Sequence, residues 1–448
     1  MKSRLLITVL LAWLPLSAAA QSLSLEECLS MASENGYQSR RSSLSVDMAR
    51  AQRNEALWEY FPRVSVTAFG YDALNPLLHL TLRDVLGNSD AANVLRTEIT
   101  DWAYQNGVKP YYDAFRSGWG SSVSVIQPLF AGGRIINGNR LARLGADAAV
   151  LQDSLARTTL RDSVENKYWR IVALQEKRAI LNQTADFLSS LDKDLSSAVE
   201  AGLALETDLL QLRLKKGELE AGRYMLEGGL ALAKMDLFSE IGYPYRYQDL
   251  SSIELSESLE DLPSPTEILR PDVSATPQFR LLDMQVEATK LQKKMAVGEL
   301  LPQVAIGGMY GYTALSRPRP GRFNGMVFAT LQIPITDMGK ALQRSKRYDY
   351  QVKQAALDAE YLQEKLQLLE GKLRLEMESA WNQMQVTADA VEVATQLLAQ
   401  MRTQYAAGRI TASELMRVSL EVNTARENLL SRRIAYRKAL RAYLALQS

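Results

Sequence analysis

Two stretches of this sequence are too long for the helices of an ordinary globular domain. Residues 135–199 and 340–405 keep a helical period of apolar side chains almost without Pro or Gly. At 1.5 Å per residue, each stretch would form a helix roughly 100 Å long. Apolar positions step by four and three from Ala380 to Tyr405, and again from Leu415 to Leu429. This spacing predicts coiled-coil helices that run out, reverse at a turn and return in pairs.

The first residues predict export from the cytoplasm. Met1-Lys2-Ser3-Arg4 is basic, residues 5–16 are apolar, and small residues lead up to Ala20. This pattern is typical of a secretory signal peptide cleaved after Ala20. No later segment has about 18 consecutive apolar residues, so we expect no transmembrane helix. Any membrane contact would then come from strands or from an anchor.

The inventory of reactive side chains argues against an enzyme. The chain has one cysteine, Cys28, which we expect to be a buried core thiol, and one histidine, His79. A His-rich metal site and Cys/His or Ser/His catalysis are therefore excluded. The 52 basic and 51 acidic residues nearly cancel, which argues against a nucleic-acid partner, and no nucleotide-binding loop occurs. We expect no catalytic residue, no cofactor and no metal.

Three short motifs occur twice in the same order, which predicts a tandem duplication. The pairs are Phe61-Pro62-Arg63-Val64 with Leu301-Pro302-Gln303-Val304, Gln127-Pro128-Leu129-Phe130 with Ile333-Pro334-Ile335-Thr336, and Ala201-Gly202 with Ala407-Gly408. The second and third pairs are 206 residues apart and the first is 240 apart. The first half therefore holds an insertion of about 34 residues between its strands.

The duplication predicts four parts of the chain. They are the signal peptide at 1–20, a first repeat at 21–240, a linker at 241–275 and a second repeat at 276–448. Each repeat should contain a leading helix (24–58 and 276–299), two strands (64–71 and 118–130, then 304–312 and 324–335) and a long helical hairpin (134–240 and 339–447). The insertion at 72–117, with a helix-like stretch at 82–102, would be extracellular. It is interpreted either as a cap on a barrel mouth or as a tolerated surface insertion.

The strands alternate apolar and polar residues and have aromatic residues near their ends. Residues 64–71 and 327–333 both follow this pattern, which is typical of outer-membrane barrels; a small soluble sheet packed on the helices is the alternative. In hydrocarbon every backbone polar group needs a protein partner, so a sheet must close. Four strands cannot enclose a water-filled lumen, whereas three copies would supply about twelve. The predicted fold is a mixed α/β membrane protein, with long coiled-coil hairpins and four strands per protomer in a trimeric barrel.

The order of these features resembles the TolC-like outer-membrane efflux proteins. The resemblance is carried by the signal peptide, the segment Leu23-Ser24-Leu25-Glu26-Glu27-Cys28, the two strand–strand–hairpin repeats, and Tyr405-Ala406-Ala407-Gly408 before Ser413-Glu414-Leu415. It implies a homotrimer in the bacterial outer membrane, in contact with its lipid, with a twelve-helix cylinder in the periplasm. It also implies docking to a periplasmic adaptor (membrane fusion) protein and an inner-membrane transporter, with passive conduction through the duct. Asn35-Gly36 departs from the Asn-Pro that is common in the family.

The resemblance also implies a constriction just past the hairpin turns. Asp208 and Glu414 hold the equivalent repeat positions, so three copies would gather six carboxylates that favour cations. The alternative is that they cap helix starts, where acidic side chains are favourable. Arg417, where the family often has a second acid, is placed to pair with Glu414 three residues before it.

The hairpin turns are expected at Gly202 and Gly408, where a positive φ helps the chain to reverse. The resemblance makes the surrounding side chains candidate contacts for the adaptor: Leu203, Leu205, Arg409 and Ile410. Two other functions remain open at this stage. One is a structural or adhesive periplasmic coiled-coil protein, and the other is an envelope enzyme, for which the sequence shows no polar constellation.

Overall fold

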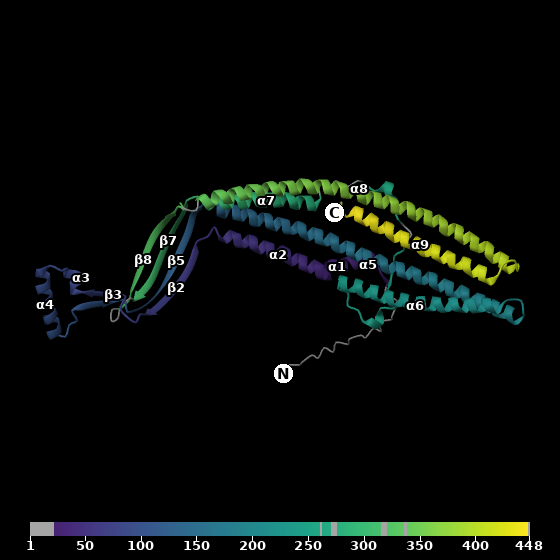
Figure 1. The fold of residues 1–448 in the computed structure, drawn as a ribbon, viewed down its shortest axis with the longest axis horizontal. Coiled ribbons are helices and arrows are strands. Elements are labelled where there is room, and N and C mark those ends of the chain that lie inside the picture. The colour runs from purple at the N-terminus through teal and green to yellow at the C-terminus, as the bar shows by residue number, and fades with distance from the viewer. Residues whose placement is uncertain (1–21, 260–261, 270–275, 315–319, 336–337, 447–448) are drawn as a thin grey trace, which may run out of the picture. The chain divides into compact units, whose positions relative to one another are not determined.

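Figure 1 shows the computed structural model, which describes residues 22–259, 262–269, 276–314, 320–335 and 338–446. The predicted signal peptide lies outside these residues. Within them, no helix is both long and apolar enough to cross a membrane. The structure is mainly helical with one larger sheet, which confirms the mixed α/β fold predicted for the protomer.

The two longest helices match the two stretches that stood out in the sequence. They are α5 (Arg134–Glu200) and α8 (Met338–Ala406), and each is followed after a short turn by a returning helix, α6 (Glu206–Ile241) or α9 (Ala412–Leu444). The helical hairpins predicted from the periodicity are therefore present.

The predicted leading helix at 24–58 is instead two helices. These are α1 (Leu25–Asn35), which begins at a capping box between Ser24 and Glu27, and α2 (Tyr37–Trp58). Gly36 separates them with an extended backbone (φ −60°, ψ 138°). A Cβ atom at Gly36 would lie 2.3 Å from the Ala32 carbonyl oxygen, so the close approach requires glycine. The second leading helix, α7 (Pro277–Gly298), is continuous.

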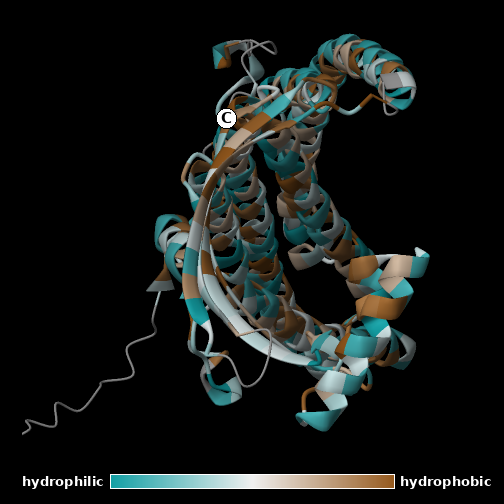
Figure 2. Cartoon of the chain, turned by 90° about the vertical axis from the view of Figure 1, so that its left-hand side faces the viewer, coloured by the Kyte–Doolittle hydropathy of each residue, from teal (hydrophilic) through white to brown (hydrophobic). Residues whose placement is uncertain are grey.

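The larger sheet is antiparallel throughout, in the order β2–β5–β7–β8. Its strands are β2 (Arg63–Asp72), β5 (Ser117–Ala131), β7 (Gln303–Ala314) and β8 (Arg322–Gln332). All four strands were predicted, although β8 ends at Gln332, whereas the predicted strand continued to residue 335. Pro334 follows, and proline cannot donate a backbone hydrogen bond to a continuing ladder. The sheet is strongly curved (Figure 2).

The insertion between β2 and β5 is a small α/β element. A hairpin of β3 (Leu78–Thr81) and β4 (Tyr111–Ala114) encloses α3 (Leu82–Leu86) and α4 (Asp90–Gln105). The helix-like stretch predicted at 82–102 is therefore helical but divided in two, because Gly87 adopts φ +75° and ends α3.

The chain forms two compact units. Unit 1 comprises the described residues of 1–48, 147–284 and 357–448, and unit 2 comprises those of 49–146 and 285–356. Each unit takes segments from both repeats, because long helices contribute residues to both units. Short strands β1 (Ser22–Leu23) and β6 (Glu254–Leu255) pair in parallel within unit 1.

Unit 1 contains the buried apolar clusters, including the predicted core thiol. Cys28 is fully buried in the same apolar cluster as Tyr168 and Phe238, and its burial raises the pKa of the thiol to about 12. Lys234 is also buried, and its ammonium donates a 2.8 Å hydrogen bond to the Leu250 carbonyl, while burial lowers its pKa. Both groups serve packing in a closed core rather than an accessible site.

Candidate functional site

Both hairpins of unit 1 end in the same backbone motif. Gly202 has φ +74° and Gly408 has φ +70°, as the sequence predicted for a chain reversal. The next residue donates back into the helix in each case: Leu203 N–H to the Ala198 carbonyl at 2.7 Å, and Arg409 N–H to the Gln404 carbonyl at 2.9 Å. These bonds define a Schellman cap with glycine in the left-handed position.

The two hairpin tips nevertheless expose different chemistry. The first tip presents two apolar side chains, Leu203 at 83% exposure and Leu205 at 68%. The second presents the exposed cation Arg409, while Ile410 is half-buried against the core beneath. A partner that touches both tips would therefore meet an apolar surface at one and a positive charge at the other.

Asp208 and Glu414 occupy the same position in their helices, the third helical residue of α6 and α9. Each is followed by a buried leucine, Leu209 or Leu415, in one shared apolar cluster. The Ser413 hydroxyl also donates a 3.3 Å hydrogen bond to the Gln211 amide oxygen. The structure thus brings the two predicted carboxylate positions to one end of unit 1.

Their local hydrogen bonding differs. Glu414 forms a capping box: its carboxylate accepts from Thr411 N–H at 2.9 Å, and its own N–H donates to the Thr411 hydroxyl at 3.2 Å. Leu205 holds the matching position before Asp208 and has no polar side chain with which to cap the helix. Glu414 therefore caps the start of its helix, which was the alternative to a role in a constriction. At the start of α6, the N-cap residue Leu205 offers Asp208 no side-chain hydrogen bond.

The prediction that Arg417 pairs with Glu414 is wrong. The Arg417 guanidinium instead pairs with Glu421 four residues on, at 2.6 Å. Because the capping box already orients the Glu414 carboxylate toward Thr411, Arg417 turns toward the next helical turn. Arg417 and Glu414 are both exposed.

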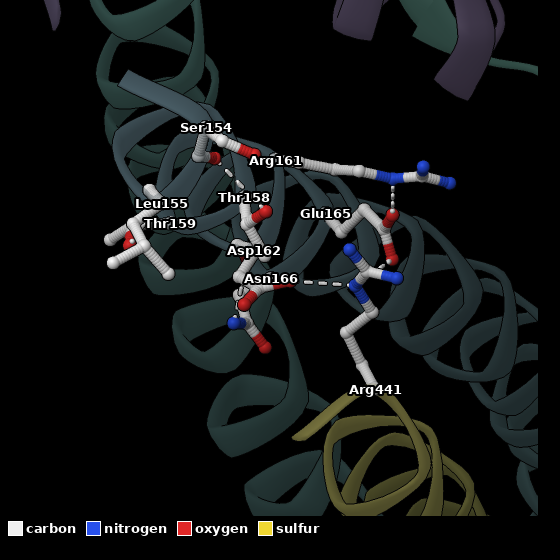
Figure 3. A network of polar contacts seen from close by, with 9 residues as sticks. All are labelled: Ser154, Leu155, Thr158, Thr159, Arg161, Asp162, Glu165, Asn166 and Arg441. Atoms are coloured by element: carbon white, nitrogen blue, oxygen red, sulfur yellow. Dashed lines mark hydrogen bonds and ion pairs between the residues drawn. The ribbon is translucent and has the colours of Figure 1, made fainter. Parts of the chain in front are cut away.

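A second polar group, which the sequence did not single out as a site, joins α5 to α9 further along unit 1 (Figure 3). Arg441 Nε lies 2.6 Å from the Asp162 carboxylate and 3.4 Å from that of Glu165, which also pairs with Arg161 at 2.9 Å. Burial raises the pKa of Asp162, and Arg441 opposes that shift. Asp162 interrupts the apolar period of α5, but its partner Arg441, 279 residues away in the sequence, could not be identified from that pattern.

The strand register in unit 2 sorts the sheet side chains onto two faces. One face, called the apolar face, carries Val64, Val66, Ala68, Val123, Val125, Ile306, Tyr310, Val327, Ala329 and Leu331. The other, called the polar face, carries Ser65, Thr67, Ser122, Ser124, Thr313, Asn324, Thr330 and Gln332, together with the apolar residues Phe69, Ile126, Met309, Met326 and Phe328. Residues of the apolar face are exposed in the chain, with Val66 at 73% and Val327 at 90%.

Aromatic rings gather at both ends of the strands. At the end that carries the insertion, Trp119 and Phe323 lie on either side of Tyr312, with ring centroids 5.0 Å and 5.2 Å away. At the end next to the helices, Trp58 packs on Phe61 at 5.3 Å. Apolar strand centres between aromatic ends match the pattern of membrane barrels.

Unit 1 also leaves apolar stripes uncovered on two of its helices. On α6 the exposed large apolar side chains are Leu210, Leu214, Tyr224, Met225 and Leu232. On the unit 1 part of α8 they include Leu357, Tyr361, Leu368, Leu375, Val386 and Val393. Contacts to a further helix would cover stripes of this spacing.

Comparison with protein-family models and with curated proteins gives no match for this sequence. Solved structures give clear matches in fold. The outer membrane protein VceC from Vibrio cholerae has a TM-score of 0.71 at 14% identity, over 95% of this chain and 96% of that one. The MtrE outer membrane channel of Neisseria gonorrhoeae, in its open state, has a TM-score of 0.71 at 13% identity, over 96% and 92%.

A membrane protein from Pseudomonas aeruginosa is similar to the same degree, with a TM-score of 0.73 at 14% identity, over 95% of this chain and 93% of that one. The chain therefore has the fold of the outer-membrane channels along nearly its whole length. This confirms, at the level of fold, the resemblance to TolC-like proteins.

Proposed function

We propose that the chain is one protomer of a trimeric outer-membrane channel whose helices continue as a periplasmic duct. It would conduct compounds passively and without a catalytic step. An inner-membrane transporter would deliver them through a periplasmic adaptor. The fold shared with the outer membrane protein VceC and with the MtrE outer membrane channel supports this proposal.

The sheet carries the proposal. Its edge strands, β2 and β8, have no neighbour on their outer sides in the described sheet, while its apolar face is exposed. In hydrocarbon such edges must be paired, and pairing β8 of one copy with β2 of the next closes a barrel of three copies. The uncovered apolar stripes on α6 and α8 fit the same assembly, because neighbouring copies would cover them as well.

Purification in mild detergent tests the assembly. The proposal expects a species of three chains that inserts into planar bilayers and produces discrete conductance steps. A monodisperse monomer that stays soluble without detergent would overturn it. That result would favour the structural coiled-coil protein instead.

Within the channel, we propose that Asp208 and Glu414 line a constriction near the hairpin tips. Three copies of each would place six carboxylates around the opening, and a ring of carboxylates attracts cations. The exposed tip residues Leu203, Leu205 and Arg409 are the proposed contacts for the adaptor, with Ile410 supporting them from the core.

The constriction is tested with Asp208→Asn combined with Glu414→Gln. Glutamine can take the place of glutamate in a capping box, so this change removes charge while keeping the start of α9. We expect a clear loss of cation preference, measured as the reversal potential across a salt gradient. Glu206→Gln, two residues before Asp208, is the matched control and should leave the preference unchanged. An unaltered preference in the double variant removes both residues from the constriction.

A further inference from the structure

Unit 2 contains a cavity of about 550 Å³ at the end of the sheet next to the helices. Strand residues from the polar face, including Thr330 and Gln332, form part of its wall. Its apolar lining comes from Ile126, Phe130, Ile135, Met295 and Val304. A volume of this size, with apolar walls and a few polar groups, is typical of sites for small organic ligands.

The charged residues that line the cavity are two carboxylates, Glu59 and Glu299, and two arginines, Arg63 and Arg134. Glu59 pairs with Arg63, and Glu299 pairs with Arg344, so each lining carboxylate has its own arginine. Arg344 itself does not line the cavity, and the second lining arginine, Arg134, contacts neutral acceptors: Nη2 lies 3.3 Å from the Gln303 amide oxygen and Nε lies 3.4 Å from the Ala131 carbonyl. In the part of the chain that the structure describes, no ion pair joins Arg134 to a carboxylate. With Arg344 counted as the partner of Glu299, three arginines meet two carboxylates, and the positive charge left over is that of Arg134.

The backbone around Arg134 is held by close packing. Gly132 has φ +62°, and a Cβ atom there would lie 1.9 Å from the Gly298 carbonyl oxygen at the end of α7. A Cβ atom at Gly298 would in turn lie 2.2 Å from the Gly132 carbonyl oxygen and 3.1 Å from Cγ of Arg134. The start of α5 therefore abuts α7 without a side chain between them, which positions the guanidinium at the cavity.

We propose that this cavity binds amphiphilic organic anions, with the apolar body against Phe130 and Met295 and the anionic group at Arg134. A guanidinium offers a planar pair of donors that suits carboxylate, sulfonate or phosphate oxygens. The inference rests on the proposed channel, in which the polar face lines the lumen and a solute reaches the cavity from the water. Neutral apolar molecules would share the walls but lack the ionic contact.

The test compares two probes with the same ring system. Anilinonaphthalene sulfonate carries an anionic group, whereas N-phenylnaphthylamine does not, and each is added to the trimer in planar bilayers of neutral lipid. We expect the sulfonate to block the current at lower concentration than the neutral probe. Arg134→Gln should weaken the block by the sulfonate about tenfold, since hydrogen bonds to charged groups contribute about 1.5–3 kcal/mol, and should leave the neutral probe unaffected.

Two further variants separate charge from structure. Arg134→Lys keeps the positive charge and should restore most of the block. Arg140→Gln removes an exposed cation of α5 that does not line the cavity, and should not alter it. Equal block by both probes, or an unchanged block in Arg134→Gln, overturns the site. Absence of any conductance before a probe is added would count against the channel instead.

The same chemistry could come from a lipid headgroup or from a dissolved compound. Replacing part of the neutral lipid with phosphatidylglycerol distinguishes the two sources. A block that weakens identifies an anionic lipid as the competing occupant, whereas an unchanged block identifies solutes of the lumen. The requirement for Arg134 is expected in both lipid mixtures.

Discussion

The two compact units differ in whether their apolar side chains are buried or exposed. In unit 1, leucines, aromatic residues and Cys28 are buried in three clusters between the helices. In unit 2, the apolar face of the sheet stays exposed, although its strands pair in register apart from one irregularity between Pro128 and Phe130. Unit 1 therefore encloses its own apolar core, whereas unit 2 exposes an ordered apolar surface that only another molecule can cover.

This difference separates two sources of stability. Apolar burial contributes roughly 25 cal/mol per Å² when it removes surface from water, and unit 1 gains this within a single chain. The sheet of unit 2 gains it only when lipid or neighbouring copies cover it. Folding of the helices and assembly in the membrane should therefore respond to different substitutions.

The largest effect is expected in the core of unit 1. Leu212 is 1% exposed in the cluster beneath the hairpin tips, so Leu212→Ala should lower the free energy of unfolding by about 2–5 kcal/mol. Leu210 on the same helix is 57% exposed, and Leu210→Ala should cost less than about 1 kcal/mol within the protomer. Urea titration followed by helical circular dichroism measures both. Similar losses would contradict the assignment of the core.

A smaller effect is expected on the apolar face of unit 2. Val66→Lys should destabilise the protein in lipid vesicles by about 2–4 kcal/mol, because it places a charge in hydrocarbon. Thr67→Lys, one residue on, points to the polar face and should cost about 1 kcal/mol or less. The comparison uses reversible unfolding from vesicles. If both lysines were equally tolerated, the sheet would not lie in a membrane.

The smallest effects concern two aspartates of α5 whose pKa values shift in opposite directions. Burial raises the pKa of Asp162, so folding favours its protonated form, and stability should fall as pH rises from 3.8 through the raised pKa. The hydrogen bond from Lys216 lowers the pKa of Asp192, so folding favours the ionised carboxylate. This contribution to stability is complete above pH 3.8 and should be lost as the pH falls through the lowered pKa.

Pairing each wild-type titration with its isosteric variant isolates these slopes. Compared with Asp162→Asn, the wild-type protein should lose stability as the pH rises from 3.8 through the raised pKa of Asp162. Compared with Asp192→Asn, the wild-type protein should gain stability as the pH rises from the lowered pKa of Asp192 to 3.8. Chemical denaturation at a series of pH values measures the differences. Slopes of the same sign for both aspartates would contradict the assigned environments.

Much of the fold could be predicted because periodic patterns extend over long stretches. The long helices, the four strands and the glycines at both hairpin tips follow from local rules that repeat many times or require one special backbone angle. Breaks depended on single residues and were missed: Gly36 divides a predicted helix, and Gly87 divides another. At these positions a close contact or a positive φ outweighs the tendency of the flanking residues.

The contacts of the candidate functional residues were harder to predict from the sequence. Asp208 and Glu414 could be located by repeat position, but the capping box of Glu414 and the turn of Arg417 toward Glu421 depend on local geometry. The ion pairs of Arg441, and the contact of Arg134 with the Gln303 amide oxygen, depend on residues distant in the sequence.

Sequence alone determined which segments are helical, which are extended and which residues alternate, because these properties arise from neighbours along the chain. Tertiary structure decided which apolar residues are enclosed and which are left exposed, since that depends on the strand register and on helices brought together from both halves. The Val66 side chain is apolar in either case. Only the register of β2 against β5 places it on an open face rather than in a core.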